Sequence, residues 1–231
     1  MPLSLSPAQT RRRLLVVVLL TLLPWPAVWL GMYKLDSLVW TFALYHGVCL
    51  LPAAVWGRRL WLRAIKMPTW PQWVALGIAV LVVLPLSLVA YARIGADFLS
   101  PQDVLHVVTL RGFQAKWLWP LGFYFVPVNA ILEEMFWRGV VLNELRGMDE
   151  KAWALGVAWT TLTFAAWHYL VLRLLLRHGW AEATVLAIVA AGVFLAWMYR
   201  RTGSLVLPIL WHGLVFDLAL IVIFGAVLRA K

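Results

Sequence analysis

Seven apolar stretches, each close to the length that a helix needs to cross a bilayer, follow one another along the chain. A bilayer core of about 30 Å takes roughly 20 apolar residues in a helix. The stretches occupy residues 14–32, 38–56, 73–92, 117–132, 152–172, 183–199 and 204–228. The fourth and sixth are the shortest, so their ends either continue past the first charged residue or are buried by neighbouring helices. The pattern predicts an all-α fold, a polytopic membrane helix bundle of about seven transmembrane helices within a range of six to eight.

The overall composition agrees with this class of protein. Hydrophobic residues make up 64% of the 231 residues and charged residues only 13%, with a mean hydropathy of +0.85. A soluble domain is about half apolar and roughly a quarter charged, so this composition excludes one. The chain is also too apolar to be disordered, and the lone Cys49 excludes a disulfide scaffold.

Basic residues outnumber acidic ones, 20 against 10, but they lie in short clusters between the apolar stretches rather than in one patch. We interpret the excess as membrane topology and expect no nucleic-acid partner. With the N-terminus inside, the inner segments carry Arg11, Arg12, Arg13, Arg58, Arg59, Arg63, Lys66, Arg138, Arg146, Lys151, Arg200 and Arg201. The outer segments then carry Lys34, Arg93, Arg111, Lys116, Arg173, Arg177, Arg229 and Lys231. This bias predicts a cytoplasmic N-terminus, and the first apolar stretch is too long for a signal-peptide core, which indicates an uncleaved anchor.

The one long connection, between Arg93 and Lys116, contains its own helix signal. Ser100 is a good cap, Pro101 suits the first helical turn, and Asp103 complements the positive end of a helix dipole. We expect a short helix here, lying in the membrane interface. No internal repeat is apparent, so residues 1–231 are expected to form a single integral membrane domain.

Ionisable residues inside apolar spans are costly and are therefore candidates for function. Glu133 and Glu134 end the fourth stretch, and Arg138 follows four residues after Glu134. Residues four apart lie on nearly the same face of a helix, whereas adjacent residues point about 100° apart. Arg138 can thus pair with Glu134 and leave Glu133 to face a different neighbour, an arrangement that separates a structural carboxylate from a catalytic one.

Two histidines add polar groups at membrane depth on two further helices. His168 lies deep in the fifth stretch, and His212 lies in the seventh, shortly before Asp217. All of these groups are satisfied most economically if they meet. Two histidines and a carboxylate can activate water for attack on a carbonyl, and the same set can also hold Zn²⁺.

Each residue also has a purely structural interpretation. A membrane histidine can serve only as a helix–helix hydrogen bond, and adjacent glutamates near the end of a span can form an interfacial charge cluster with Arg138. His46 belongs to no recognisable motif and is expected to pack or to form hydrogen bonds, and Cys49 is expected to be a small core residue. Taken together, the polar residues on three successive spans favour a site.

The motifs resemble those of the CPBP (Abi) membrane endopeptidases, a family that includes the type II CAAX prenyl proteases. Glu133-Glu134-Met135-Phe136-Trp137-Arg138 fits the EExxxR signature, and Phe164 to His168 fits FxxxH. The third signature, a histidine followed four residues later by Asn or Asp, is met only in part, because position 216 is Phe and the acid is Asp217. The resemblance covers about residues 117–220, which we therefore take as the catalytic half.

The resemblance implies glutamate-dependent intramembrane proteolysis without a metal or another cofactor. By analogy, Glu133 would activate water together with His168, Glu134 and Arg138 would order the site, and His212 would stabilise the oxyanion. Asp217 is retained as a candidate site residue. Five residues on a regular helix rotate by about 140°, so Asp217 should face away from His212 unless a π-bulge re-aims it.

Alternatives from other classes stay open at this point. A zinc-dependent membrane protease could use the same residues, although the chain contains no HExxH motif. A non-catalytic immunity or binding protein could use the polar cluster without chemistry. We expect an endopeptidase in a prokaryotic plasma (inner) membrane, acting on a membrane-associated peptide or protein that carries no prenyl group.

Overall fold

The computed structural model describes residues 7–146 and 152–229, and all the regular structure in these ranges is helical. The expected all-α helix bundle is thereby confirmed. Most of the long helices are composite, because α-helical segments alternate with wider π-helical turns. The first composite helix consists of α1 (Pro7–Leu22), α2 (Pro24–Trp29) and η1 (Leu30–Lys34). The second consists of α3 (Leu38–Phe42), η2 (Ala43–Leu50) and α4 (Leu51–Trp56), followed by the short α5 (Arg58–Trp61) and η3 (Leu62–Ala64).

The remaining helices follow in chain order. They are α6 (Trp70–Phe98), α7 (Pro101–Leu110), a composite run, α11 (Ala152–Leu175), α12 (Trp180–Thr202) and a last composite helix. The composite run comprises η4 (Ala115–Trp117), α8 (Leu118–Tyr124), η5 (Phe125–Asn129), α9 (Ala130–Glu134), η6 (Met135–Leu142) and α10 (Asn143–Arg146). The last helix comprises α13 (Val206–Trp211), η7 (His212–Asp217) and α14 (Leu218–Arg229).

Six helices in the described ranges are long and apolar enough to cross a membrane. They are Arg11–Lys34, Leu38–Trp56, Trp70–Phe98, Ala152–Leu175, Trp180–Thr202 and Val206–Arg229. They correspond to six of the seven expected spans. The chain is an integral membrane protein, and six spans in the described ranges is the lower limit of the expected six to eight. Most of them extend a few residues beyond the predicted ends.

The predicted span 117–132 is the exception and needs a correction. It does not end at the glutamates, because the helix continues through η6 and α10 as far as Arg146. It is also absent from the six spans, since Asn129, Glu133 and Glu134 make it less apolar. Arg138, which the charge pattern predicts among the inner segments, is instead buried in the middle of this run.

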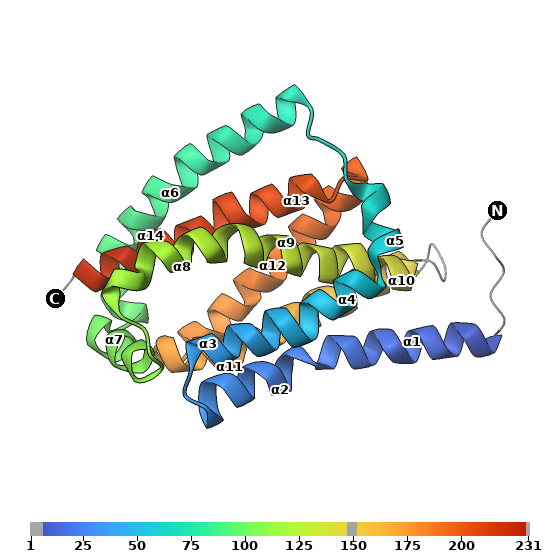
Figure 1. Cartoon of the computed structure of the whole chain (residues 1–231). Coiled ribbons are helices and arrows are strands. Elements are labelled where there is room, and N and C mark those ends of the chain that lie inside the picture. The colour runs from blue at the N-terminus through green and yellow to red at the C-terminus, as the bar shows by residue number, and fades with distance from the viewer. Residues whose placement is uncertain (1–6, 147–151, 230–231) are drawn as a thin grey trace.

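This least apolar run lies at the centre of the bundle. Figure 1 shows α8 and α9 between α13 and α14 on one side and α3 and α4 on the other, with α10 continuing to the end of the bundle beside α5. Every residue from Phe136 to Leu142 is buried. Other helices therefore surround the polar residues of this run and separate them from lipid, which is the arrangement expected for ionisable groups at membrane depth.

The peripheral helices differ sharply from the central run. Only 6% of the most apolar window of α6 is buried within the protein, and α6 packs mainly against α14 and η7. Figure 1 shows its Trp70 end leaning away from the other helices. The expected helix after Ser100 is confirmed as α7, in which the Ser100 hydroxyl accepts a hydrogen bond from the Asp103 N–H at 3.3 Å. Its position in the membrane interface stays a prediction.

Close packing between η5 and η7 depends on Gly213. A Cβ atom at this position would lie 2.8 Å from the Val126 carbonyl oxygen, a backbone atom that cannot move aside. The glycine therefore lets the helix that carries His212 approach the helix that carries the glutamates.

We expect Gly213→Ala to destabilise the protein by about 1–3 kcal/mol, the usual cost of overpacking a close contact. Thermal unfolding in one detergent measures the effect. Gly77→Ala is the matched control, because a Cβ atom there meets nothing within 4 Å, and its melting temperature should stay the same or rise. Equal melting of both variants would contradict the close approach of η5 and η7.

Candidate functional site

Two adjacent carboxylates form the centre of the candidate site. Glu133 and Glu134 lie at the end of α9, and their exposed fractions are 1% and 0%. A buried carboxylate is costly unless charged or hydrogen-bonded partners compensate for its lost hydration. The partners of the two glutamates differ, and this difference separates their roles.

Glu134 is held by an arginine and a histidine on one oxygen. Arg138 Nη1 donates to Glu134 Oε1 at 2.7 Å, and His212 Nδ1 lies 2.9 Å from the same oxygen. Arg138 also donates through Nη2 to the Gly192 carbonyl of α12 at 3.0 Å. The predicted pairing of Glu134 with Arg138 is present, and the pair connects three helices in the bundle.

Glu133 has fewer donors than Glu134, although Oε2 of Glu134 also lacks a hydrogen-bond partner among the described residues. Its Oε1 accepts a hydrogen bond from the Tyr45 hydroxyl at 2.6 Å. Its Oε2 lies 3.4 Å from His212 Nε2 and has no hydrogen-bond partner among the described residues. Glu133 thus retains a free acceptor next to an imidazole, as a group that receives a proton from water requires.

His212 joins the two glutamates to Asp217. Its Nδ1 faces Glu134, and its Nε2 faces both Glu133 Oε2 at 3.4 Å and Asp217 Oδ1 at 3.5 Å. Since an ionised carboxylate only accepts hydrogen bonds, the Nδ1 nitrogen carries a proton toward Glu134. The ring is thereby fixed in orientation between the acidic residues.

A π-helical turn explains why Asp217 reaches His212. Residues His212–Asp217 form η7, and the Leu218 N–H donates to the carbonyl of Gly213, five residues earlier. The wider turn reduces the rotation per residue, so two residues five apart lie on one face. The π-helical turn that Asp217 requires to share a face with His212 is therefore present, and Asp217 faces His212.

His168 enters the site through aromatic contacts rather than a direct bond to the acids. Its Nδ1 lies 2.8 Å from the Phe164 carbonyl oxygen, so Nδ1 carries the proton and the neutral ring keeps its acceptor at Nε2. Its ring stacks on Trp167, with centroids 3.8 Å apart. The Phe164 ring lies between the two histidines, 4.8 Å from His168 and 6.1 Å from His212.

A hydrogen-bonded chain behind the acids was not expected from the sequence. The Asn129 Nδ2 group donates to Asp217 Oδ2 at 3.1 Å, and Asn129 Oδ1 lies 3.0 Å from His46 Nε2. His46 Nδ1 in turn lies 2.8 Å from the Tyr124 hydroxyl. The hydrogen bonds in this series all point the same way, because Asp217 and the Asn129 carbonyl can only accept and each therefore requires a proton on its neighbour.

Sequence reasoning therefore missed Tyr45, Asn129 and Tyr124 as residues of this region. Asn129 precedes Glu133 by four residues and shares its helix face, which is a signal that could have identified it. Tyr45 and Tyr124 offer no such signal. His46 was expected to form a hydrogen bond or pack, and it does form hydrogen bonds within the chain of Asn129 and Asp217.

The arrangement can support acid–base chemistry on a buried water or peptide bond. Three carboxylates, from Glu133, Glu134 and Asp217, lie within 4 Å of the His212 ring, and Glu134 also pairs with Arg138. Among the described residues, no group of three or more His, Cys, Asp or Glu side chains is arranged to hold a metal ion.

These features define an integral membrane protein with a buried carboxylate–histidine site. Residues 115–216 match the family model described as "Rce1-like: Type II CAAX prenyl endopeptidase Rce1-like". The match confirms the resemblance to the CPBP family and supports a CAAX-type intramembrane protease at the level of that family. It contains every motif residue except Asp217, which lies one position beyond it. No curated protein and no solved structure matched the chain.

The Glu134–Arg138 pair gives a direct test of the site's architecture. We expect Arg138→Met to destabilise the protein by about 3–5 kcal/mol, because the substitution leaves Glu134 buried without its cation. Equilibrium unfolding in mixed micelles measures this. The variant Glu134→Gln/Arg138→Met removes both charges and should recover part of the loss.

Arg13→Met is the control for this experiment. It breaks a more exposed pair, between Arg13 Nη1 and Glu144 Oε2 at 3.6 Å, and should cost about 0–1 kcal/mol. A cost for Arg138→Met as small as that of the control would contradict the assignment of a buried structural pair.

Proposed function

We propose that the protein is an intramembrane endopeptidase that hydrolyses a peptide bond of a membrane-associated protein or peptide with a glutamate-activated water. One observation carries the proposal: the buried Glu133 carboxylate keeps Oε2 without a hydrogen-bond partner among the described residues, 3.4 Å from His212 Nε2. A general base needs such a free acceptor beside a group that can stabilise developing charge. The family match is consistent with this chemistry.

Glu133 is assigned the role of general base. It removes a proton from water as the oxygen attacks the scissile carbonyl, and the resulting carboxylic acid returns that proton to the leaving amine. The Tyr45 hydroxyl, which donates to Glu133 Oε1 at 2.6 Å, holds the carboxylate so that Oε2 faces the reacting atoms. His168 offers its Nε2 acceptor as a second contact for the same water.

His212 is assigned the stabilisation of the tetrahedral intermediate. Its ring is oriented by Glu134, and Glu134 is neutralised by Arg138. Asp217 is assigned a positioning role, because an ionised carboxylate would repel an oxyanion. Its two oxygens connect Asn129 to His212, and this contact sets the position of the imidazole.

The proposed substrate is an unprenylated peptide or membrane protein in a prokaryotic plasma membrane, with the N-terminus of the enzyme in the cytoplasm. The site lies inside a bundle of membrane-spanning helices, so a substrate must reach membrane depth to meet Glu133. Prenylated substrates are the alternative within the family, and comparing cleaved proteins with and without a prenyl group separates the two.

Replacing Glu133 should abolish cleavage without unfolding the protein. We expect cells that express wild type to contain new protein termini in their membranes that are absent with Glu133→Gln at equal abundance, because the amide cannot accept a proton from water. Mass spectrometry of membrane-protein termini measures this and identifies the substrate. Glu182→Gln is the matched control, since Glu182 is exposed and bonds only to Tyr169 among the side chains described, and its profile should equal that of wild type.

Two outcomes would favour the alternatives. Loss of cleavage in a chelator, with recovery on adding Zn²⁺, would replace the glutamate mechanism with a zinc protease. Identical termini for wild type and Glu133→Gln, under conditions in which wild type has a phenotype, would favour a non-catalytic immunity or binding protein.

The hydrogen bonds that link Asn129, His46 and Tyr124 predict that turnover falls less when the substituted residue is farther from Asp217. For a peptide that spans an identified cleavage site, we expect Asn129→Ala to lower kcat by roughly 10–100-fold with KM little changed, because Asp217 and His212 lose their fixed position. Tyr124→Phe removes a more distant link and should cost less. A loss that follows only the melting temperatures, or an equal loss in both variants, would contradict the positioning role.

A further inference from the structure

A pocket far from the glutamates lies between three separate segments of the chain. It has a volume of about 210 Å³ and is lined by Arg13, Trp56, Gly57, Arg59, Leu60 and Glu144. Arg13 belongs to α1, Glu144 belongs to α10, and the other residues surround the junction of α4 and α5. Glu144 follows Glu133 by eleven residues, or roughly 16 Å along a helix, so this pocket is separate from the candidate catalytic site.

The position of the pocket corresponds to the ends of membrane spans. Arg13 is the third residue of the span Arg11–Lys34, and Trp56 is the last residue of Leu38–Trp56. Figure 1 shows the start of α1, α5 and α10 at the same end of the bundle. The pocket therefore opens at the level of the lipid headgroups, where an exposed tryptophan such as Trp56 is characteristic.

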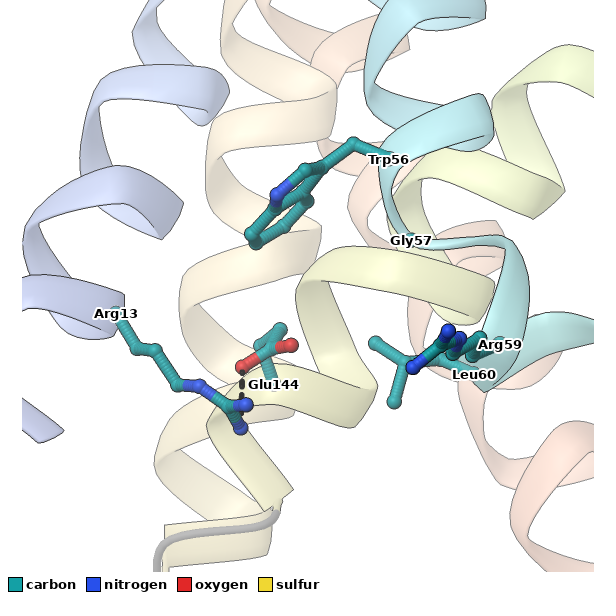
Figure 2. A pocket seen from close by; sticks show the side chains of 6 residues that line it. All are labelled: Arg13, Trp56, Gly57, Arg59, Leu60 and Glu144. Atoms are coloured by element: carbon teal, nitrogen blue, oxygen red, sulfur yellow. Dashed lines mark ion pairs between the residues drawn. The ribbon is translucent and has the colours of Figure 1, made fainter. Parts of the chain in front are cut away.

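The lining combines cationic donors with an apolar wall. Figure 2 shows Arg13 reaching Glu144 from one side, while Trp56 and Leu60 point toward the same space from the other helices. The Arg13–Glu144 contact is long, at 3.6 Å, and the Arg13 side chain is 52% exposed, so its guanidinium retains free donors. The Arg59 side chain has no hydrogen bond or ion pair within the described part of the chain.

These features select a ligand with an anionic head and an apolar tail. Arginine guanidinium groups match the geometry of phosphate oxygens, and basic pockets between membrane helices suit acidic lipid headgroups. At about 210 Å³, the pocket is smaller than the roughly 300–1,000 Å³ typical of sites for drug-sized ligands, so it suits a headgroup rather than acyl chains. Exposed apolar side chains follow or precede the lining residues in the sequence, Leu14 and Leu15 after Arg13 and Val55 before Trp56, and the acyl chains would lie against such side chains.

We propose that this pocket binds the phosphodiester headgroup of an anionic phospholipid. Arg13 and Arg59 hold the phosphate oxygens, Trp56 and Leu60 contact the glycerol and the start of the acyl chains, and Glu144 accepts hydrogen bonds from hydroxyl groups of the headgroup. The bound lipid links α1 to the α4–α5 junction and to α10, the helix that continues from the glutamates. The proposal concerns lipid binding only and does not depend on proteolytic activity.

The test is a lipid titration of the purified full-length chain, read by native mass spectrometry. Phosphatidylglycerol is the probe, and phosphatidylcholine and inorganic phosphate are the comparison ligands. We expect a retained phosphatidylglycerol adduct on wild type, and binding weaker by about fivefold or more in Arg13→Gln/Arg59→Gln. The control Arg12→Gln/Arg63→Gln removes the same charge at the same end of the bundle but outside the pocket, and should bind like wild type.

Four results would overturn the proposal. Equal weakening in both double variants would show general attraction to the basic surface. Equal binding of phosphatidylcholine would show that the pocket does not prefer an anionic headgroup. Full competition by inorganic phosphate at the same concentration would show that the pocket recognises phosphate alone and not a lipid. Unchanged binding in Arg13→Gln/Arg59→Gln, with melting temperatures that show all variants folded, would place the lipid elsewhere.

Discussion

The structure of this protein depends on the cost of placing charge inside a membrane. Glu134 is completely buried, and it is tolerated because Arg138 and His212 both donate to one of its oxygens. Those two contacts, together with the bond from Arg138 to the Gly192 carbonyl, tie the central run to α12 and to η7. Compensation of one buried carboxylate therefore links three helices around the site.

The division of labour between the adjacent glutamates follows from this constraint. Glu134 has two strong donors on Oε1 and is held as a structural anion. Glu133 has one donor, Tyr45, and its second oxygen faces His212 without a hydrogen bond. Two neighbours in sequence thus experience different environments, because a helix turns them toward different helices. The Oε2 atoms of both glutamates lack a hydrogen-bond partner among the described residues, so the two differ in the donors on Oε1: Arg138 and His212 for Glu134, and Tyr45 for Glu133. Different environments for paired carboxylates are typical of acid–base sites.

Wider helical turns occur where polar groups must converge. The π-helical turn of η7 brings Asp217 back to the face of His212, η5 ends at Asn129, and η6 follows Glu134 directly. Such turns cost hydrogen-bond geometry and are frequent at functional sites, where they re-aim a side chain. The pocket lined by Arg13, Arg59 and Glu144 at the end of the bundle needs no such turn, because its donors extend from the ends of spans toward the headgroup region.

The sequence by itself determined the class of fold, six of the spans, the capped helix after Ser100, and the pairing of Glu134 with Arg138. Those features rest on apolar length, capping residues and spacing along one helix, which are local properties of the chain. Tertiary structure alone decided that the helix continues past Glu134, that Arg138 is buried, and that Tyr45, His46 and Asn129 surround the acids. The contacts that decide these facts join residues far apart in the sequence: Arg138 and Gly192 are 54 positions apart, and Tyr45 and Glu133 are 88 positions apart. Helical periodicity describes which face a residue occupies, but only packing determines which helix lies opposite.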